Sequence, residues 1–396
     1  MISDNNNIYL NDLGILCALG SDREQVKDNM LRGYQGGMME SSDYSQDPLV
    51  LGVVQEQLPE IPESLSHYAC RNNQMLLHVM EQIRPTLEKC LQGLVPDRVG
   101  VVLRTCTGGN AEAQDYLDDY SQQQAMPSNF NPDITFMGDC ADFVADYLNL
   151  RGPRYVMSTA CSSSGNAMAS AARLIKSNLC DAVVVGGADA LCSLTVRGFS
   201  ALGVVSQSVC NPSSVNRKGV NIGEGAALFV MSKKPAGVRL AGVGVCSEAF
   251  HISKPRADGS GAEKAMSLAL HNAALSADDI HYVNLHGTAT ELNDAMENLA
   301  VNRLFGSDVP CSSTKSMTGH ALGAAAAIEA AICWMLLENN ADNVRLPVHC
   351  WDGQEDANLA ALNLVEAEQE SLELKYCMSN SFAFGGNNAS LILGRA

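Results

Sequence analysis

Cys161 has the surroundings that covalent chemistry requires of a cysteine. It lies in residues 158–165, which read Ser-Thr-Ala-Cys-Ser-Ser-Ser-Gly. The residues before it, 155–157, favour a strand, and the alanine-rich residues 166–172 favour a helix. At such a junction the free N–H groups and positive end of a helix lower a thiol pKa toward neutrality. The sequence therefore predicts a nucleophilic thiolate, although a small buried cysteine would fit the same stretch.

Two histidines are the candidate partners of Cys161. His286 begins the turn His-Gly-Thr-Ala-Thr, in which Thr288 and Thr290 offer hydroxyl groups to a ligand. His320 ends the segment Lys-Ser-Met-Thr-Gly-His that begins at Lys315, directly before an alanine-rich run. Each could instead be a structural histidine at a turn or a helix start. No group of His, Cys and carboxylate residues has metal-ligand spacing, so we expect no metal site.

The elements that would position these residues follow an α/β pattern. Continuous apolar runs predict buried strands near residues 8–16, 99–103, 155–157, 182–187 and 238–246. Apolar spacing predicts helices near residues 24–31, 72–90 and 137–148. The apolar run 321–337 predicts a buried helix rather than a membrane span, because Glu329 interrupts it. Residues 114–132 are polar and are predicted to be irregular.

The second part of the chain repeats the rhythm of the first. Leu240 and Gly244 stand in register with Leu10 and Gly14, residues 315–324 match residues 161–170, and residues 384–387 match 185–188. Because these matches keep their order, we predict two similar α/β halves, residues 1–234 and 235–396. Halves packed about a pseudo-twofold axis would bring Cys161 to the turn that carries His320. Chance recurrence of short Gly/Ala strings is the alternative.

Composition narrows the function classes. The 396 residues are 46% hydrophobic and 18% charged, with a net charge of −18, so nucleic acid and anionic membranes are poor partners. The 14 cysteines include no C-x-x-C pair, and the N-terminus has neither a basic region nor an apolar signal core. We therefore expect a cytoplasmic protein with reduced cysteines and no membrane span.

Four motifs together resemble the β-ketoacyl-acyl carrier protein synthases of the thiolase superfamily. They are Ser-Thr-Ala-Cys161-Ser-Ser-Ser, Leu-His286-Gly-Thr-Ala-Thr, Lys315-Ser-Met-Thr-Gly-His320 and Asn380-Ser-Phe-Ala-Phe384-Gly-Gly-Asn. The resemblance, which runs from about residue 8 to residue 393, implies a five-layered αβαβα fold of two similar halves. It also implies a catalytic triad of Cys161, His286 and His320.

The same resemblance implies roles for the surrounding residues. Lys315 and Glu329 would form a supporting ion pair, although a lysine could also lie solvated on the surface. Phe384 would gate the acyl pocket, and its N–H with that of Cys161 would form an oxyanion hole. Thr288 and Thr290 would hold the phosphopantetheine arm of an acyl carrier protein.

The activity implied is decarboxylative Claisen condensation of a malonyl thioester with an acyl group on Cys161, in type II fatty acid, polyketide or aryl polyene synthesis. No cofactor would be bound, since the substrates are carried on phosphopantetheine. The chain would form a homodimer, or a heterodimer with a chain-length-factor-like homologue. A chain-length partner subunit and a non-decarboxylating thiolase-like acyltransferase are the alternatives, and the intact triad argues against both.

One segment departs from the family pattern. Many relatives carry Pro-Phe-Asp before an Arg-x-Gly segment, whereas here residues 210–219 read Cys-Asn-Pro-Ser-Ser-Val-Asn-Arg-Lys-Gly. The Phe and Asp are replaced, and residues 204–209 before them form a short segment. This departure affects the expected substrate range and local partner contacts, not the triad.

Overall fold

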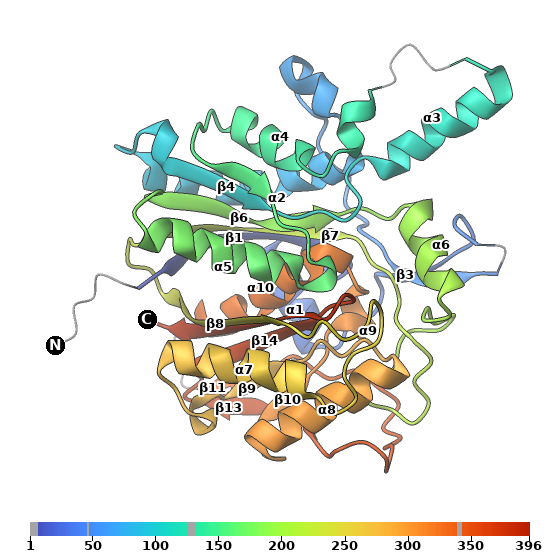
Figure 1. The fold of residues 1–396 in the computed structure, drawn as a ribbon, viewed down its shortest axis with the longest axis vertical. Coiled ribbons are helices and arrows are strands. Elements are labelled where there is room, and N and C mark those ends of the chain that lie inside the picture. Colours follow the sequence, from blue (N-terminus) through green and yellow to red (C-terminus); the bar gives the residue numbers. More distant parts are fainter. Residues whose placement is uncertain (1–6, 46, 126–130, 339–342) are drawn as a thin grey trace.

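A computed structural model describes residues 7–45, 47–125, 131–338 and 343–396 (Figure 1). The helices in these ranges are α1 Arg23–Leu31, α2 Arg71–Leu91, α3 Asn110–Gln123, α4 Asp139–Tyr147, α5 Ser163–Lys176, α6 Ser193–Ala201, α7 Ser260–Ala273, α8 Glu291–Phe305, α9 Lys315–Thr318 and α10 Ala325–Glu338. The strands are β1 Tyr9–Cys17, β2 Met38–Ser41, β3 Leu49–Gly52, β4 Val99–Leu103, β5 Arg154–Val156, β6 Ala182–Asp189, β7 Gly225–Ser232, β8 Val238–Ser247, β9 Tyr282–Asn284, β10 Pro310–Ser312, β11 Asn343–Arg345, β12 Asn363–Leu364, β13 Glu370–Leu372, β14 Tyr376–Phe382 and β15 Asn387–Arg395.

The main sheet has the same strand order when read outward from its centre in either direction. One side runs β1-β7-β6-β4-β5, and the other runs β8-β15-β14-β9-β10, followed by β12. On both sides the first two pairings are antiparallel and the next two are parallel. This repeated topology confirms the prediction of an α/β fold built from two similar halves. The boundary between residues 234 and 235, which falls between β7 and β8, stays a prediction.

The two sides of the sheet meet at a single residue pair. Tyr9 of β1 pairs with Arg239 of β8 in antiparallel fashion. This pair has the same offset as the predicted match of Leu10 with Leu240, as expected when a pseudo-twofold axis passes between equivalent strands. The matched glycines are explained by close approach of helices, because a Cβ on Gly14 would lie 2.2 Å from Val79 O and one on Gly244 would lie 1.9 Å from Ala265 O.

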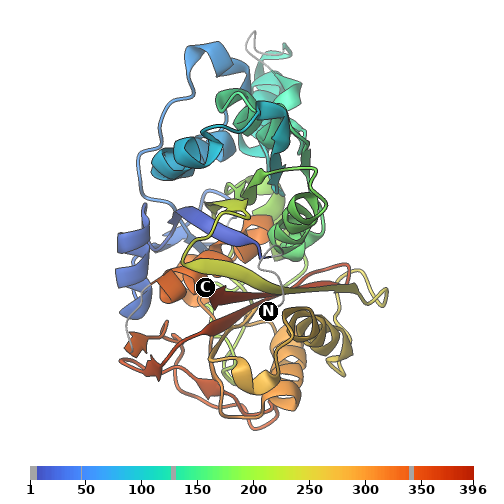
Figure 2. The same ribbon diagram turned by 90° about the vertical axis from the view of Figure 1, so that its left-hand side faces the viewer.

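Five layers result from this arrangement. Helices α2 and α4 cover the outer face of the first-half strands, α5 and α10 lie between the two sets of strands, and α7 and α8 cover the far side (Figure 1). Figure 2 shows the same order from the side, with the orange helix α10 between the strands of the two halves. Residues 325–337 of α10 are all buried, which explains why this helix is apolar all round. None of the helices in the described ranges is long and apolar enough to cross a membrane.

Three local predictions were wrong. Residues 114–132 were expected to be irregular, but α3 covers Asn110–Gln123 and ends at Gln124 with a left-handed φ of 56°. This helix has no buried residue, so no apolar period marks it in the sequence. A bond from Gln114 Nε2 to Asp118 Oδ1, 2.9 Å long, supports it on its polar surface instead. Residues 126–130 of this prediction lie outside the described ranges.

The second wrong prediction is the register that aligned Lys315 with Cys161. Each central helix follows a three-residue 3₁₀ turn, Ala160–Ser162 before α5 and Leu322–Ala324 before α10. Both turns begin with a left-handed residue, Ala160 with φ 50° and Leu322 with φ 48°. The structural equivalent of Cys161 is therefore Gly323. The glycine pairs do not correspond either, because Gly186 and Gly187 lie inside β6 whereas Gly385 and Gly386 lie between β14 and β15.

Candidate active site

Cys161 lies at the start of the buried helix α5, in a turn held by its neighbouring serines. Ala160 before it has the left-handed φ of 50°, which is unfavourable for an alanine. Ser163 Oγ accepts the Thr159 N–H at 2.7 Å and donates to Ala160 O at 2.5 Å. Ser162 Oγ donates to Thr159 O at 2.9 Å. The serine run therefore fixes the strained turn that presents the Cys161 sulfur.

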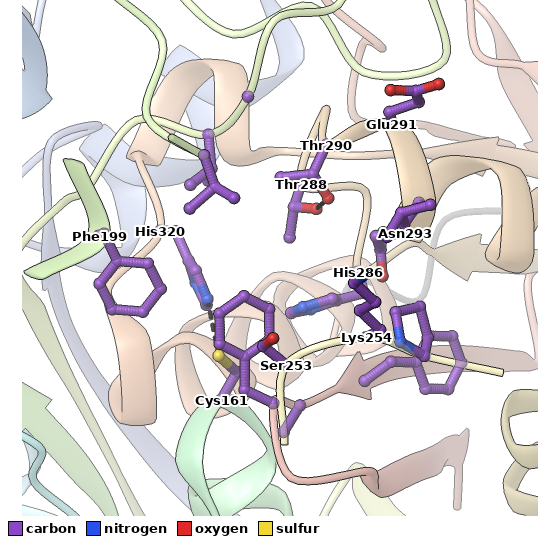
Figure 3. Close-up of a pocket in the computed structure, with 18 of the residues that line it drawn as sticks. Cys161, Phe199, Ser253, Lys254, His286, Thr288, Thr290, Glu291, Asn293 and His320 are labelled. Carbon is purple, nitrogen blue, oxygen red and sulfur yellow. Dashed lines mark hydrogen bonds between the residues drawn. The ribbon is translucent and has the colours of Figure 1, made fainter. Parts of the chain in front are cut away.

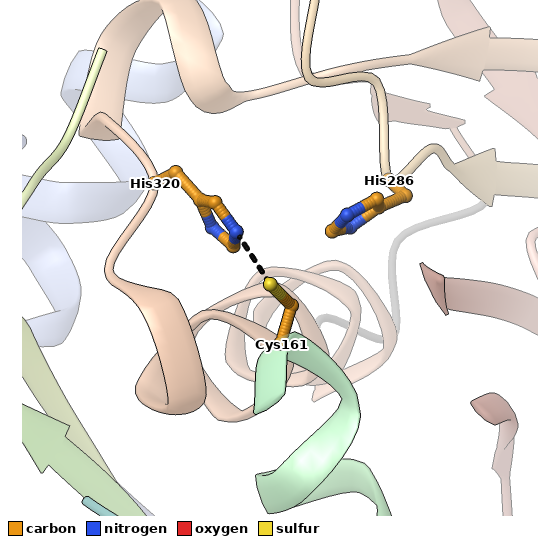
Figure 4. A group of neighbouring side chains, drawn as sticks. All are labelled: Cys161, His286 and His320. Atoms are coloured by element: carbon orange, nitrogen blue, oxygen red, sulfur yellow. Dashed lines mark hydrogen bonds between the residues drawn. The ribbon is translucent and has the colours of Figure 1, made fainter. Parts of the chain in front are cut away.

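His320 contacts that sulfur directly. It follows α9, and its backbone N–H donates to Asn221 O at 2.7 Å, which anchors it to the first half of the chain. His320 Nε2 lies 3.0 Å from Cys161 Sγ, at hydrogen-bonding distance (Figure 4). The predicted meeting of Cys161 with the turn that carries His320 is thus present in the structure.

His286 completes the group from the loop after β9. Its backbone N–H donates to Glu297 Oε1 and the next N–H, of Gly287, donates to Glu297 Oε2, both at 2.7 Å. The ring centroids of His286 and His320 are 5.4 Å apart. Ligand-type atoms of Cys161, His286 and His320 lie within 4.8 Å of one another, and all three residues are buried.

Lys315 is fully buried beside His286 and forms an ion pair with Glu329 of α10. Its Nζ also lies 3.4 Å from His286 Nδ1. An ammonium group can only donate, so Nδ1 must accept and the proton of a neutral His286 ring resides on Nε2. Lys315 is therefore part of the site, and a solvated surface lysine is excluded.

Burial decides the protonation states of the group. It raises the pKa of Cys161 to about 11, although the Lys315 charge and a hydrogen bond from the Phe384 N–H oppose this rise. The prediction of a thiol pKa lowered toward neutrality was therefore wrong for the unliganded protein, because loss of hydration outweighs the helix end. Burial and then the Lys315 charge hold the pKa of both His286 and His320 well below its usual range. At neutral pH the group is a thiol beside two neutral imidazoles.

A cavity of about 350 Å³ leads from this group toward the surface. Cys161, His286 and His320 lie at one end, Glu291 lies at the other, and Thr288 and Thr290 lie between them (Figure 3). The two threonine Oγ1 atoms are 2.9 Å apart. Phe384 also lines the cavity, and its ring stacks on Phe199 at 5.8 Å. The structure thus brings all the predicted substrate-binding residues into one space with the triad.

Several functional contacts were missed in the sequence. Glu297 and Asp294 of α8 bind the backbone of the 286–290 loop, Asp294 through the Ala289 N–H at 3.1 Å. These bonds reach back across 5 to 11 residues, so no local capping pattern marks them in the sequence. Burial raises the pKa of Glu297 to about 7, and the two backbone N–H groups oppose that rise. Asn221 and Phe199 carried no local signal either.

Metal chemistry cannot be judged from sequence spacing here. The absence of a ligand pattern along the chain led us to expect no metal site, yet folding gathers a cysteine and two histidines from distant segments. Cys and His are the side chains that bind zinc. The same three groups also suit nucleophilic catalysis, in which a thiol, a base and hydrogen-bond donors face one substrate.

The departing segment 210–219 forms a fixed wall of the cavity. Ser213 N–H donates to Asp294 at 2.8 Å, Ser214 Oγ donates to Asp352 at 2.8 Å, and Arg217 forms a buried ion pair with Asp356 at 2.7 Å. Arg217 and Lys218 line the cavity. The replaced residues are therefore engaged with the second half of the chain.

Comparison with known proteins agrees with this geometry. Residues 73–236 match the family model of the beta-ketoacyl synthase N-terminal domain, and residues 238–345 match that of the C-terminal domain. Nodulation protein E of Rhizobium meliloti is 38% identical over 297 residues, which are 72% of this chain and 68% of that protein. A 3-oxoacyl-[acyl-carrier-protein] synthase 2 of the same species is 37% identical over 62% of each chain.

Solved structures extend the likeness over nearly the whole chain. The ketosynthase ApeO of Xenorhabdus doucetiae, solved in complex with its chain length factor ApeC, is 40% identical with a TM-score of 0.94, over 99% of this chain and 98% of that one. A beta-ketoacyl synthase of Burkholderia phymatum is 25% identical with a TM-score of 0.87, over 99% and 100% of the two chains. On these grounds, and with a thiol, two imidazoles and a thiolase-like fold in place, the chain belongs to the beta-ketoacyl synthase family.

Proposed function

We propose that this protein joins acyl units by decarboxylative Claisen condensation, with the growing acyl group on Cys161 and the malonyl unit on an acyl carrier protein. The observation that carries the proposal is the 3.0 Å contact of Cys161 Sγ with His320 Nε2 at the closed end of a cavity that His286 also lines. A thiol with a neutral base accepts an acyl group, and paired imidazole donors stabilise an enolate.

Acylation begins with proton transfer. Cys161 is a thiol at neutral pH, so its proton passes to His320 Nε2 as the sulfur attacks the thioester carbonyl. The oxyanion that forms is held by the N–H groups of Cys161 and Phe384, the second of which already points at the sulfur. When the oxyanion collapses, the carrier thiolate leaves and takes the proton from His320. The acyl group then remains on Cys161.

Condensation uses the two imidazoles as donors. Loss of CO₂ from the malonyl thioester places its bonding electron pair in an enolate, whose oxygen accepts a hydrogen bond from His286 Nε2–H. His320 is the second donor once its remaining ring proton has moved from Nδ1 to Nε2. Lys315 at Nδ1 keeps the His286 proton on Nε2, where it can reach that oxygen. The enolate carbon attacks the acyl carbonyl, the carbon–sulfur bond to Cys161 breaks, and the leaving thiolate takes one proton from solvent. The product is a β-ketoacyl thioester two carbons longer.

The remaining predicted residues support this chemistry. Glu329 neutralises the buried Lys315, and burial raises the pKa of this carboxyl to about 6 against the effect of the lysine charge. Phe384, stacked on Phe199, would gate the acyl side of the cavity. Thr288 and Thr290 would bind the amide groups of the phosphopantetheine arm. No resident cofactor has a place in this reaction.

We infer a type II system in which the protein works with separate partners. ApeO was solved with its chain length factor, and this supports a heterodimer with such a homologue over a homodimer. The presence of Cys161, His286 and His320 in one cavity favours the active subunit over a chain-length partner. Two converging imidazoles favour it over a non-decarboxylating acyltransferase. Aryl polyene assembly stays a prediction, as does the cytoplasm, where all 14 cysteines would remain the free thiols seen here.

The test is condensation of acyl and malonyl carrier protein, followed by mass spectrometry of both the enzyme and the carrier. We expect an acyl adduct on Cys161 and a product two carbons longer. Cys161→Ala should lose both, whereas Cys90→Ala, a half-buried cysteine outside the cavity, should keep both. Condensation by Cys161→Ala at the wild-type rate would refute the assignment of the nucleophile. If a chain-length-factor homologue is required, its addition should raise the wild-type rate only.

A further inference from the structure

A second, smaller pocket of about 260 Å³ opens beside the main cavity and shares Lys218 with it. Its other lining residues are Ser206, Ser208, Val209, Asn211 and Asn216. The lining is thus one ammonium, two hydroxyls and two amides, with a single apolar side chain. All of it lies in or beside the segment that departs from the family pattern.

The amine of Lys218 is free while its backbone is held on both sides. Among the described residues, no hydrogen bond or ion pair involves its side chain, which is exposed. On one side Arg217 Nη1 donates to Ser214 O at 2.8 Å and binds Asp356. On the other side Gly219 N–H donates to Ala289 O at 2.9 Å, with a φ of 117° that favours glycine. A fixed position therefore presents an uncompensated cation.

The pocket wall is built on the residue that also anchors the catalytic histidine. Asn221 is buried, and its Nδ2 donates to Ser206 O at 3.2 Å and Ser208 O at 2.9 Å. Its Oδ1 accepts the Cys210 N–H at 2.6 Å, and its backbone O accepts the His320 N–H at 2.7 Å. The hydroxyls of Ser206 and Ser208 lie 3.4 Å apart on this framework. The pocket is therefore fixed relative to Cys161.

The surrounding charges favour an anion as its ligand. Two nearby carboxylates are already engaged, Asp356 by Arg217 and Asp352 by Ser214 Oγ and Asn216 Nδ2, each at 2.8 Å or less. Glu355, which pairs with Ser214 through the backbone, is exposed and does not line the pocket. Glu291 is exposed and lines the main cavity, not this pocket. An ammonium group with hydroxyl and amide donors is a set of groups that binds phosphate oxygens.

The position of Lys218 at the outer end of the cavity indicates which anion it could bind. Cys161 is 7% exposed and Thr288 is 7% exposed, whereas Lys218 lies in the exposed rim. A 4′-phosphopantetheine thioester that reaches Cys161 carries its reacting sulfur at one end and its phosphate ester at the other. We propose that Lys218 and the pocket beside it bind the phosphate ester of the pantetheine arm. This inference rests on the proposed function and assigns to it a recognition site outside the triad.

The test compares acyl-pantetheine, acyl-4′-phosphopantetheine, acyl-CoA and acyl carrier protein as acyl donors to Cys161. Lys218→Ala should raise KM about tenfold for the donors that carry a phosphate ester and leave acyl-pantetheine unchanged, because only the former lose a charged hydrogen bond. Lys218→Arg should restore most of the difference. Lys254→Ala removes another rim lysine that lines only the main cavity, and it should not discriminate among the donors by phosphate.

Binding without turnover gives a second readout. Competition by 4′-phosphopantetheine, relative to pantetheine, should weaken about tenfold in Lys218→Ala. Equal effects of Lys218→Ala and Lys254→Ala would refute the site, because general attraction to the rim predicts that result. An effect confined to the carrier protein would also refute it and would implicate carboxylates of that protein. Failure of wild type to be acylated by any donor would refute the proposed function instead.

Discussion

Replacement of Lys315 separates the structural role of the buried ion pair from its role beside His286. Lys315→Met leaves the buried Glu329 carboxylate without its charged partner, with only the Ser381 hydrogen bond remaining. Removal of one member of a buried pair costs about 3–5 kcal/mol of unfolding free energy. Lys315→Met combined with Glu329→Gln removes both charges, and it should recover most of that loss because a neutral pair is often tolerated.

Activity should not recover with stability. In both variants His286 Nδ1 loses the ammonium that faces it at 3.4 Å, so the ring proton is no longer held on Nε2. The Lys315 charge also lowers the pKa of His286, so its removal raises that pKa. Loss of one oriented donor to a developing oxyanion costs about 2.7–4 kcal/mol, or roughly 10²–10³-fold in rate. We expect this loss in decarboxylation by the single and the double variant alike.

The assays are chemical unfolding for stability and CO₂ release from malonyl carrier protein for decarboxylation. Lys176→Met, which replaces an exposed lysine at the end of α5, is the matched control and should change neither. If the double variant regained both stability and decarboxylation, Lys315 would serve only to neutralise Glu329. Lys315 would then not be needed to hold the His286 proton on Nε2.

Four further outcomes are expected. Alkylation of Cys161 by iodoacetamide should rise roughly tenfold per pH unit between pH 7 and 9, because burial raises the thiol pKa to about 11, and a plateau below pH 8 would contradict this. His286→Ala should slow CO₂ release yet spare acylation, whereas His320→Ala should slow both, since only His320 touches the sulfur. Mass spectrometry of each variant with the acyl donor alone measures acylation separately from CO₂ release. Burial raises the pKa of Glu297 to about 7, so its protonated form favours the folded state, and this stabilisation, complete below about pH 4.5, is lost as pH rises to about 7. Glu297→Gln should lack this pH dependence, so the difference in unfolding free energy between wild type and variant should change by about 3 kcal/mol from pH 4.5 to pH 7. Parallel curves would count against this expectation. Micromolar Zn²⁺ should inhibit acylation by binding Cys161, His286 and His320, and a chelator should reverse the inhibition. Equal Zn²⁺ affinity of wild type and Cys161→Ala in a direct binding assay would argue for another site.

The three residues that the structure gathers in one cavity could be singled out in the sequence because their signals are local. Cys161 stands in a strand–turn–helix pattern, and His286 and His320 each begin or end a short Gly/Thr segment. Duplication was visible for the same reason, since the match of Leu10 with Leu240 has the offset of the pair at which β1 meets β8. Such patterns depend only on neighbouring residues, so they can be recognised without knowledge of distant contacts.

Other features depend on contacts that a linear pattern does not record. Gly323 occupies the position equivalent to Cys161, and a Cβ there would lie 2.1 Å from Arg104 Nε. Because only glycine fits at this position, the sequence contains no side chain by which the two helix starts could be aligned. The Cys161 pKa follows burial from all sides rather than the local helix end. Helix α3 lacks an apolar face, and the bonds of Glu297 to the 286–287 backbone bridge 10 or 11 positions.

The short connection between β7 and β8, residues 233–237, has a kinetic consequence. The sulfur belongs to one half and both imidazoles belong to the other, so two separate chains would have to associate before any turnover, at a rate set by their abundance. A five-residue tether makes that encounter intramolecular. Bringing the sulfur and the two imidazoles together is thereby independent of dilution.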